Sequence, residues 1–144
     1  MSEKKDKQIV GNAGMYYACY QLSLLGWNVM PTSRNAKGID IIAYSPDGKK
    51  FTGIQVKTLS SPANVPVGKE DITIMGDFWI IVILPPENSN KNQNDNSQMS
   101  DPMAYILKKK EIERLQDHYG NSLWLRRNKY EKKEFENKWN RIKY

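Results

Sequence analysis

Residues 38–58 of the chain read GIDIIAYSPDGKKFTGIQVKT, and this stretch decides the fold. Two runs rich in β-branched and aromatic residues flank the Asp47-Gly48 step, which is the strongest short hairpin signal that a sequence offers. A two-residue turn at this step sets the register of the two runs and places Tyr44 opposite Phe51. We therefore predict an antiparallel hairpin at the centre of the structure.

Three polar residues, Asp40, Gln55 and Lys57, interrupt this otherwise apolar hairpin. The predicted register puts Asp40 opposite Gln55, about 5 Å away, with Lys57 on the diagonal at about 7–8 Å. Because side chains alternate along a strand, all three are expected on one face. A buried carboxylate, carboxamide and ammonium are costly unless they have a function. The alternative is a solvated hairpin with an exposed ion pair of little energetic worth.

The chemistry of this cluster points to a metal ion and a phosphate. A carboxylate from Asp40 and an amide oxygen from Gln55 are hard donors of the kind that suits Mg²⁺, and the backbone carbonyl of Val56 adds a third oxygen. Lys57 is placed to hold a phosphate or to help an attacking water lose its proton. These groups suffice for metal-assisted phosphodiester hydrolysis.

A helix followed by Gly-Ile-Asp on one strand and Ile-Gln-Val-Lys on the next resembles the PD-(D/E)XK nuclease superfamily, which includes restriction endonucleases, Holliday-junction resolvases and Mrr-type enzymes. The resemblance implies a restriction endonuclease-like αβββαβ core, an α/β fold in which helices flank a central mixed sheet. It also implies a nuclease site that holds Mg²⁺ or Mn²⁺. Asp40 matches the metal-binding aspartate, Gln55 the (D/E) position and Lys57 the lysine of the motif.

One position departs from the family pattern. Family helices often begin Gly-x-x-Gly-Glu, whereas residues 11–14 here are followed by Met15, so the first acidic ligand is absent. In some restriction enzymes the second carboxylate has moved to the helix after the third strand, where Glu70 and Asp71 fall in this chain. The alternative is that these two acids belong to the first turn of a helix, where acids favour the macrodipole.

The length of the chain predicts a single domain over residues 1–144, and apolar periodicity predicts its elements. The expected helices cover residues 10–25, 109–119 and 130–141. The expected strands cover residues 27–30, 39–44, 51–58, 78–84 and 103–107, with a short strand or turn at 122–125. Residues 60–68 are expected to form a loop, and residues 71–75 are ambiguous between helix and strand. Residues 87–102 are polar and of low complexity, which predicts a flexible loop.

Positive charge is concentrated at the C-terminus. The 144-residue chain has a net charge of +6, and residues 126–144 hold eight Lys or Arg against three acids. We expect a basic C-terminal helix over residues 126–144 that docks through Phe135, Trp139 and Ile142, while its lysines face solvent or nucleic acid. The candidate nucleic-acid contacts are Arg34, Lys69, Arg126 and Arg127.

Composition limits the cellular setting. A single cysteine, Cys19, excludes an internal disulfide and fits a reducing compartment. The polar N-terminus is no secretory signal, and the longest apolar run is too short to span a bilayer. We expect a cytoplasmic protein whose partner is nucleic acid, with DNA as the first candidate, no membrane, and a homodimer or partner chain as a further option. Two functions remain open: a metal-dependent nuclease, or a non-catalytic module that binds nucleic acid or protein.

Overall fold

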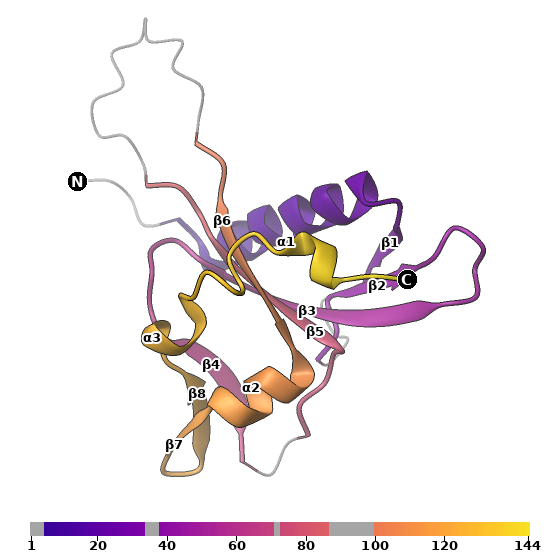
Figure 1. The fold of residues 1–144 in the computed structure, drawn as a ribbon. Coiled ribbons are helices and arrows are strands. Elements are labelled where there is room, and N and C mark those ends of the chain that lie inside the picture. The colour runs from indigo at the N-terminus through magenta and orange to yellow at the C-terminus, as the bar shows by residue number, and fades with distance from the viewer. Residues whose placement is uncertain (1–4, 34–37, 71–72, 87–99) are drawn as a thin grey trace, which may run out of the picture.

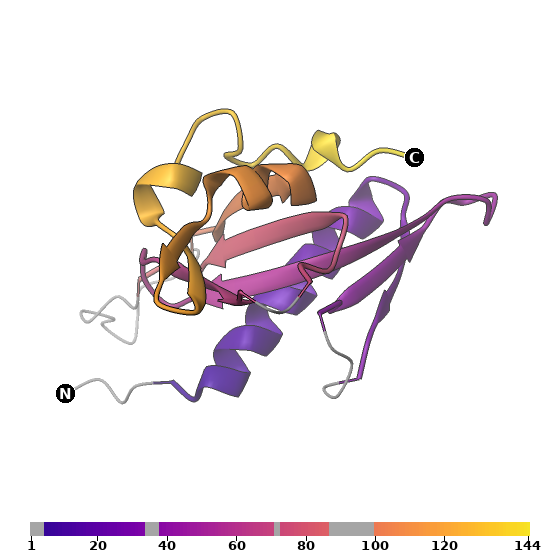
Figure 2. The same ribbon diagram turned by 90° about the horizontal axis from the view of Figure 1, so that it is seen from below.

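The structure, a computed structural model, describes residues 5–33, 38–70, 73–86 and 100–144. A five-stranded mixed sheet forms its centre, with one long helix on one face and a small three-stranded sheet on the other (Figures 1 and 2). The elements in chain order are α1 (Lys7–Leu24), β1 (Asn28–Pro31), β2 (Ile41–Tyr44), β3 (Phe51–Leu59), β4 (Val65–Lys69), β5 (Phe78–Ile83), β6 (Met103–Lys108), α2 (Lys109–Leu115), β7 (Asp117–Tyr119), β8 (Ser122–Leu125), α3 (Arg127–Tyr130) and the 3₁₀ turn η1 (Trp139–Arg141). None of the helices in these ranges is long and apolar enough to cross a membrane.

The central sheet has the strand order β1-β2-β3-β5-β6. Strands β1, β2 and β3 are antiparallel neighbours, β5 runs parallel to β3, and β6 is antiparallel to β5. The predicted mixed α/β class is therefore confirmed. The αβββαβ pattern would place a helix between the third and fourth strands of the sheet. The described residues between β3 and β5 instead contain strand β4, which belongs to the second sheet, β4-β8-β7.

Strand β4 was not predicted, because it contains Pro66 and Gly68, which are residues typical of loops. Residues 60–68 were predicted as a loop because of their prolines, yet Val65–Lys69 pairs with β8. Pro66 is accommodated because β4 is an edge strand, where a missing N–H leaves no gap in the ladder. The register shifts between Pro66 and Gly68, as expected at a β-bulge.

The hairpin of β2 and β3 has the predicted register, with Tyr44 opposite Phe51 and Ile42 opposite Gly53. Its turn differs from the two-residue turn predicted at Asp47-Gly48. The N–H of Gly48 donates to the Ser45 carbonyl at 2.8 Å, so the turn is centred on Pro46 and Asp47. Proline presets the backbone for this position of a turn, and Gly48 follows it with a φ of 71°.

Asp6 caps the start of helix α1, because its carboxylate accepts a hydrogen bond from the N–H of Gln8 at 2.7 Å. The chain turns away after the helix at Gly26, which has a φ of 93°. Helical periodicity predicts that the inner face of α1 is formed by Val10, Gly14, Ala18, Leu22 and Leu25. The first four are buried in one stripe, whereas Leu25 lies beyond the end of the helix and is 39% exposed. This stripe packs on the central sheet in a core that includes Ile41, Ile54, Ile80, Val82 and Ile106.

The opposite face of the central sheet forms a second core with α2, α3 and the small sheet. Alternate residues of β5 and β6 point into it, and it includes Trp79, Ile81, Leu107, Ile112 and Leu125. Both faces of β5 are thus covered, which explains why residues 78–84 form one uninterrupted apolar run.

The prediction of a long C-terminal helix over residues 126–144 is wrong. The chain forms only α3 and η1 there, and the segment between them follows β6, the edge strand of the central sheet (Figure 1). Ile106 N–H donates to the Phe135 carbonyl at 2.9 Å, and Asn137 N–H donates to the Ala104 carbonyl at 2.7 Å. Phe135, Trp139 and Ile142 are buried as predicted. Pairing with the open edge of β6 satisfies backbone groups that a helix would otherwise bond internally.

Helix α2 is also shorter than the predicted helix over residues 109–119. It ends at Leu115, and Asp117–Tyr119 forms β7 against β8. Most of the predicted polar loop, residues 87–99, lies outside the described residues.

Candidate metal and nucleic-acid site

The candidate site begins where β2 separates from β3. Their ladder ends at the pair Ile41 and Ile54, and one further backbone bond joins Asp40 N–H to the Ile54 carbonyl at 2.8 Å. Beyond this point the edge of β3 next to β2 has no strand partner among the described residues. The first unpaired backbone donor on this edge is the Val56 N–H, which donates a hydrogen bond to the Asp40 carboxylate at 2.7 Å.

The Asp40 side chain lies on the α1 side of this edge. Together with Val56, Met15 and other residues of α1 and the loop after β1, it lines a cavity of about 280 Å³. The face of β3 on which we expected Asp40 is occupied by Ile39, which lies so close to Gly53 that a Cβ atom there would stand 2.9 Å from Ile39 Cδ1. Alternation from Gly53 places Ile39 on the same face as Gln55.

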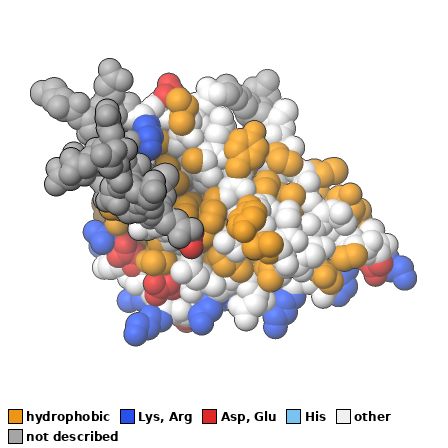
Figure 3. Space-filling model, turned by 90° about the horizontal axis from the view of Figure 1, so that it is seen from above, with side chains coloured by type: hydrophobic (Ala, Val, Ile, Leu, Met, Phe, Trp, Pro, Cys, Tyr) orange, Lys and Arg blue, Asp and Glu red, His pale blue; other side chains and the backbone are white. Residues whose placement is uncertain are grey.

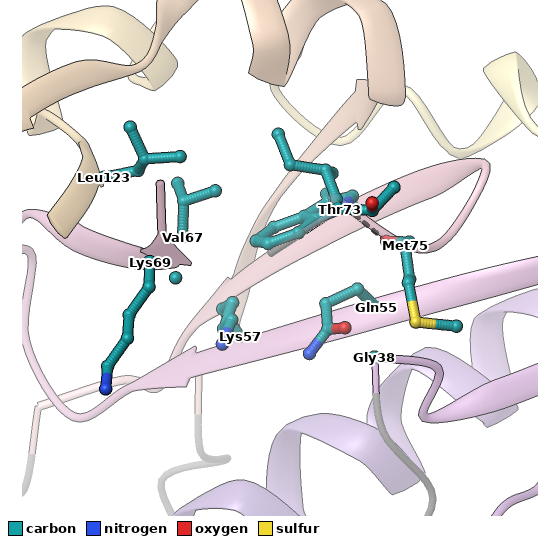
Figure 4. A pocket seen from close by; sticks show the side chains of 11 residues that line it. Gly38, Gln55, Lys57, Val67, Lys69, Thr73, Met75 and Leu123 are labelled. Carbon is teal, nitrogen blue, oxygen red and sulfur yellow. Dashed lines mark hydrogen bonds between the residues drawn. The ribbon is translucent and has the colours of Figure 1, made fainter. Parts of the chain in front are cut away.

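Gln55 and Lys57 line a different cavity, of about 330 Å³ (Figure 4). The structure therefore brings Gln55 and Lys57 together. The prediction that Asp40 shares their face is wrong, because Asp40 lines the other cavity. The reason is that β2 begins only at Ile41, so regular alternation does not extend to Asp40.

The wall of the larger cavity is mostly apolar, with cationic groups at two places. Its lining residues come from β3, β4, β5, β8 and the segments before β2 and β5; they include Gly38, Val67, Lys69, Ile74, Met75, Trp79 and Leu123. Trp79 Nε1 donates to the Met75 carbonyl at 3.0 Å, which ties the segment before β5 to the cavity wall. Of the four candidate nucleic-acid contacts, Lys69 is found in this wall.

Lys57 has an unusual environment for a lysine. It is half-buried, and its Nζ lies 5.6 Å from the centre of the Trp79 ring, within the range of a cation–π contact. Loss of solvent lowers the pKa of Lys57 below its ordinary value, and the negative charge of Asp40 acts in the opposite direction. Lys57 is thus a cation whose proton is held less tightly than usual, close enough to Asp40 to be affected by its charge.

Met15 occupies the position that the family pattern assigns to an acid. It lines the same cavity as Asp40 and Val56 and is partly buried against the α1 core. Asp40 is therefore the one acidic side chain among the described residues that line this cavity.

Glu70, one of the two acids proposed to have moved, lines neither of these cavities. Glu70 follows β4, so it is not in the first turn of a helix, and its carboxylate lies 3.8 Å from His118 Nδ1 at the surface. Asp71 and Arg34 lie outside the described residues. Asp77 has a structural role, because its carboxylate accepts hydrogen bonds from Thr52 Oγ1 at 3.1 Å and from the Gly53 N–H at 3.0 Å.

The two remaining candidate contacts are engaged in ion pairs. Arg126 Nε lies 2.9 Å from Asp117, and Arg127 Nε lies 2.8 Å from Glu131. Both pairs are partly exposed, so they do not prevent these side chains from meeting a phosphate. They do show that neither arginine projects alone from the surface.

Trp79, the largest side chain that lines the cavity of Gln55 and Lys57, was not predicted as a site residue. Its run, residues 78–84, is apolar throughout, so no periodicity marks which side chains face a cavity. The signal that identifies it is the parallel register between β3 and β5, which places Trp79 opposite Gln55.

No group of three or more His, Cys, Asp or Glu side chains suited to a metal ion occurs among the residues that the structure describes. Within the described ranges, the cavity next to Asp40 offers a cation one carboxylate and neutral oxygens. No protein-family model, no curated protein and no solved structure matches the chain.

Proposed function

We propose that the chain is a nuclease-like protein of the PD-(D/E)XK type, which hydrolyses phosphodiester bonds of nucleic acid with the help of a divalent metal ion. One observation carries the proposal: the Asp40 carboxylate lies at the open edge of β3, where it accepts a hydrogen bond from the N–H of Val56. Val56 stands between Gln55 and Lys57 in the sequence. The Asp40 carboxylate is thus held at the edge of the same strand segment whose other face carries the Gln55 amide and Lys57, a lysine of lowered pKa.

The donor set fits a small hard cation that keeps much of its water. Along a β-strand the N–H and C=O of one residue point to the same edge, so the Val56 carbonyl lies on the side of Asp40. Asp40 and Val56 would hold Mg²⁺ or Mn²⁺, and water would complete the coordination, since Gln55 lines the other cavity. Such an ion would act as a Lewis acid and make a bound water more acidic.

Lys57 would attract the phosphate of the substrate and offset its developing negative charge. Its reduced proton affinity also suits it to take part in proton transfer to or from a water near the phosphate. Lys69 in the same cavity wall adds a second positive charge for the nucleic-acid backbone.

The test is a cleavage assay of purified protein on single- and double-stranded DNA and RNA, in Mg²⁺, in Mn²⁺ and in EDTA. Asp40→Ala should abolish cleavage and Mn²⁺ binding together, and Lys57→Ala should abolish cleavage while sparing Mn²⁺ binding. Lys50→Ala, on the exposed hairpin end, is the matched lysine control. Cleavage that persists in Lys57→Ala would refute the assignment of this site.

A second candidate is a module that binds nucleic acid or protein without catalysis. Met15 favours it, because a thioether stands in the Asp40 cavity where an acid would strengthen metal binding. In that case no cleavage would occur under any metal condition. Binding to nucleic acid would weaken with salt, and Lys57→Ala and Lys69→Ala would each reduce the salt slope by about one, as expected for a lysine that neutralises a single phosphate.

A further inference from the structure

The outer face of α1 carries an exposed apolar stripe. Ile9, Tyr16, Tyr20 and Leu24 are 60, 62, 59 and 66% exposed, and Ala13 is exposed between them. At 100° per residue these five side chains fall within an arc of about 80° along the whole helix. Large apolar side chains gathered in one stripe, rather than scattered, mark an interaction surface.

The stripe is also free of charge. Lys7 is the only charged residue between Lys7 and Leu24, although the whole chain has a net charge of +6. Figure 3, which views the molecule from the α1 side, shows hydrophobic side chains gathered across the middle of this face, with lysine and arginine side chains at its rim. An uncharged centre with a charged rim is the usual anatomy of a protein–protein interface.

We propose that this face is the interface of a homodimer, in which two copies of α1 pack antiparallel across a two-fold axis. The spacing of the stripe supports a second copy as the occupant. The pair Ile9 and Leu24 has the same midpoint along the helix as the pair Ala13 and Tyr20. An antiparallel pair of helices therefore sets Ile9 against Leu24 of the partner copy and small Ala13 against large Tyr20. These are the reciprocal contacts that a two-fold interface requires.

Electrostatics favours the same arrangement. The last turn of α1 contains no basic residue to complement the negative end of its dipole. In an antiparallel pair, the positive N-terminal end of one helix dipole lies beside this negative end of the other, which is stabilising. The uncharged stripe also lets two positively charged chains meet without opposing lysines.

The available area suits the core of a dimer interface. A buried aromatic side chain contributes about 150–250 Å², so each tyrosine at its observed exposure offers roughly 100 Å². The five side chains form the centre of a patch, and the rim must supply the rest of the about 800 Å² per partner that stable interfaces bury. The proposal is independent of the nuclease assignment.

Sedimentation of the full chain at micromolar concentrations tests the proposal. We expect twice the 16.7 kDa mass of one chain for the wild type. The double variant Tyr16→Lys and Tyr20→Lys should sediment as a monomer with an unchanged circular dichroism spectrum, because both side chains are exposed. Phe51→Lys, at a position 67% exposed but away from α1, should remain dimeric. A wild-type monomer, or a dimer that survives the double variant, would overturn the proposal.

Crosslinking tests the register. In a Cys19→Ser background, Tyr16→Cys lies close to the two-fold axis and should form an intermolecular disulfide on mild oxidation, whereas Phe51→Cys should not. Equal crosslinking at both positions would contradict antiparallel packing through α1.

Discussion

Gly14 of α1 lies directly against Thr58 of β3. A Cβ atom at position 14 would stand 1.8 Å from Thr58 Oγ1 and 2.7 Å from Thr58 Cβ, so only glycine permits this approach. The contact fixes the distance between α1 and the central sheet. Met15, the next residue of the helix, lines the same cavity as Asp40.

Gly14→Ala should therefore destabilise the protein by about 1–3 kcal/mol, the usual cost of forcing a methyl group into a packed interior. Gly11→Ala is the matched control on the same helix. A Cβ atom there meets nothing within 4 Å, so alanine should stabilise the helix by up to about 1 kcal/mol. Urea unfolding monitored by circular dichroism separates the two outcomes, and a change of the same sign in both variants would contradict this account.

The hairpin and the inner face of α1 could be predicted from local sequence because their determinants are local. The Asp47-Gly48 turn signal predicted the pairing of Tyr44 with Phe51, and helical spacing identified Leu22 as buried. The path of the C-terminal segment could not be predicted in this way. Phe135 and Trp139 have helical spacing, yet their burial depends on backbone bonds to β6, about 30 residues earlier in the chain.

The candidate site was only partly predictable for a similar reason. Gln55 and Lys57 lie within a regular strand, so alternation placed them together correctly. Asp40 lies one residue before its strand begins, where backbone direction depends on the preceding loop and on the packing of Ile39 over Gly53. Beyond the end of a strand, the alternation of side chains no longer predicts which face a residue is on.

Glu111 anchors the C-terminal segment and should be important for stability. Its carboxylate accepts two hydrogen bonds from Arg141 Nη2, at 2.7 and 2.9 Å, and one from the Lys108 N–H at 2.8 Å. Glu111→Ala should cost about 2–3 kcal/mol, because a largely buried guanidinium loses a bidentate partner. Glu113→Ala, two residues along α2, loses only an exposed pair with Lys109 at 4.0 Å and should cost less than about 0.5 kcal/mol.

Tyr130 should make the protein sensitive to alkali. Burial raises the pKa of Tyr130 from 10.0 to about 12, while its hydroxyl donates to the Ala63 carbonyl at 2.5 Å. Because the folded state holds this proton more tightly, the resulting stability is complete below pH 10 and is lost between about pH 10 and 12. Tyr130→Phe should lower stability at pH 8 by about 0.5–1.5 kcal/mol.

The free energy of unfolding in urea at a series of pH values checks this prediction. The difference between wild type and Tyr130→Phe should shrink as the pH rises through 10 to 12. Tyr119→Phe, at an exposed position, is the control and should leave the pH dependence unchanged. A constant difference across this range would contradict a raised pKa for Tyr130.

Lys57 should reduce stability at neutral pH. Desolvation lowers the pKa of Lys57, so the folded state binds this proton less tightly than the unfolded state. Its contribution is therefore complete above the ordinary value of 10.5 and is lost as the pH falls through the lowered pKa. Lys57→Met should raise the melting temperature at pH 7, and this gain should narrow as the pH approaches 10.5.

The exposed Lys50→Met is the control and should leave the melting temperature within about 2 °C, as surface substitutions usually do. A lower melting temperature in Lys57→Met would mean that the contacts of Lys57 with Trp79 and Asp40 outweigh its desolvation. A higher melting temperature together with lost cleavage would show that the lysine serves activity rather than folding.

Met15→Glu tests whether the Asp40 cavity is suited to a divalent ion. The new carboxylate would face Asp40 inside the same cavity, so in EDTA the two like charges should lower the melting temperature relative to wild type. In Mg²⁺ or Mn²⁺ the same pair should bind the ion at least tenfold more tightly, equivalent to about 1.4 kcal/mol, because a second anionic ligand strengthens a hard-cation site. Met15→Gln, similar in size but neutral, should show neither effect. Calorimetric titration with Mn²⁺ and melting curves with and without the ion measure both, and a Met15→Glu variant that gains no affinity over Met15→Gln would exclude a metal ion from the Asp40 cavity.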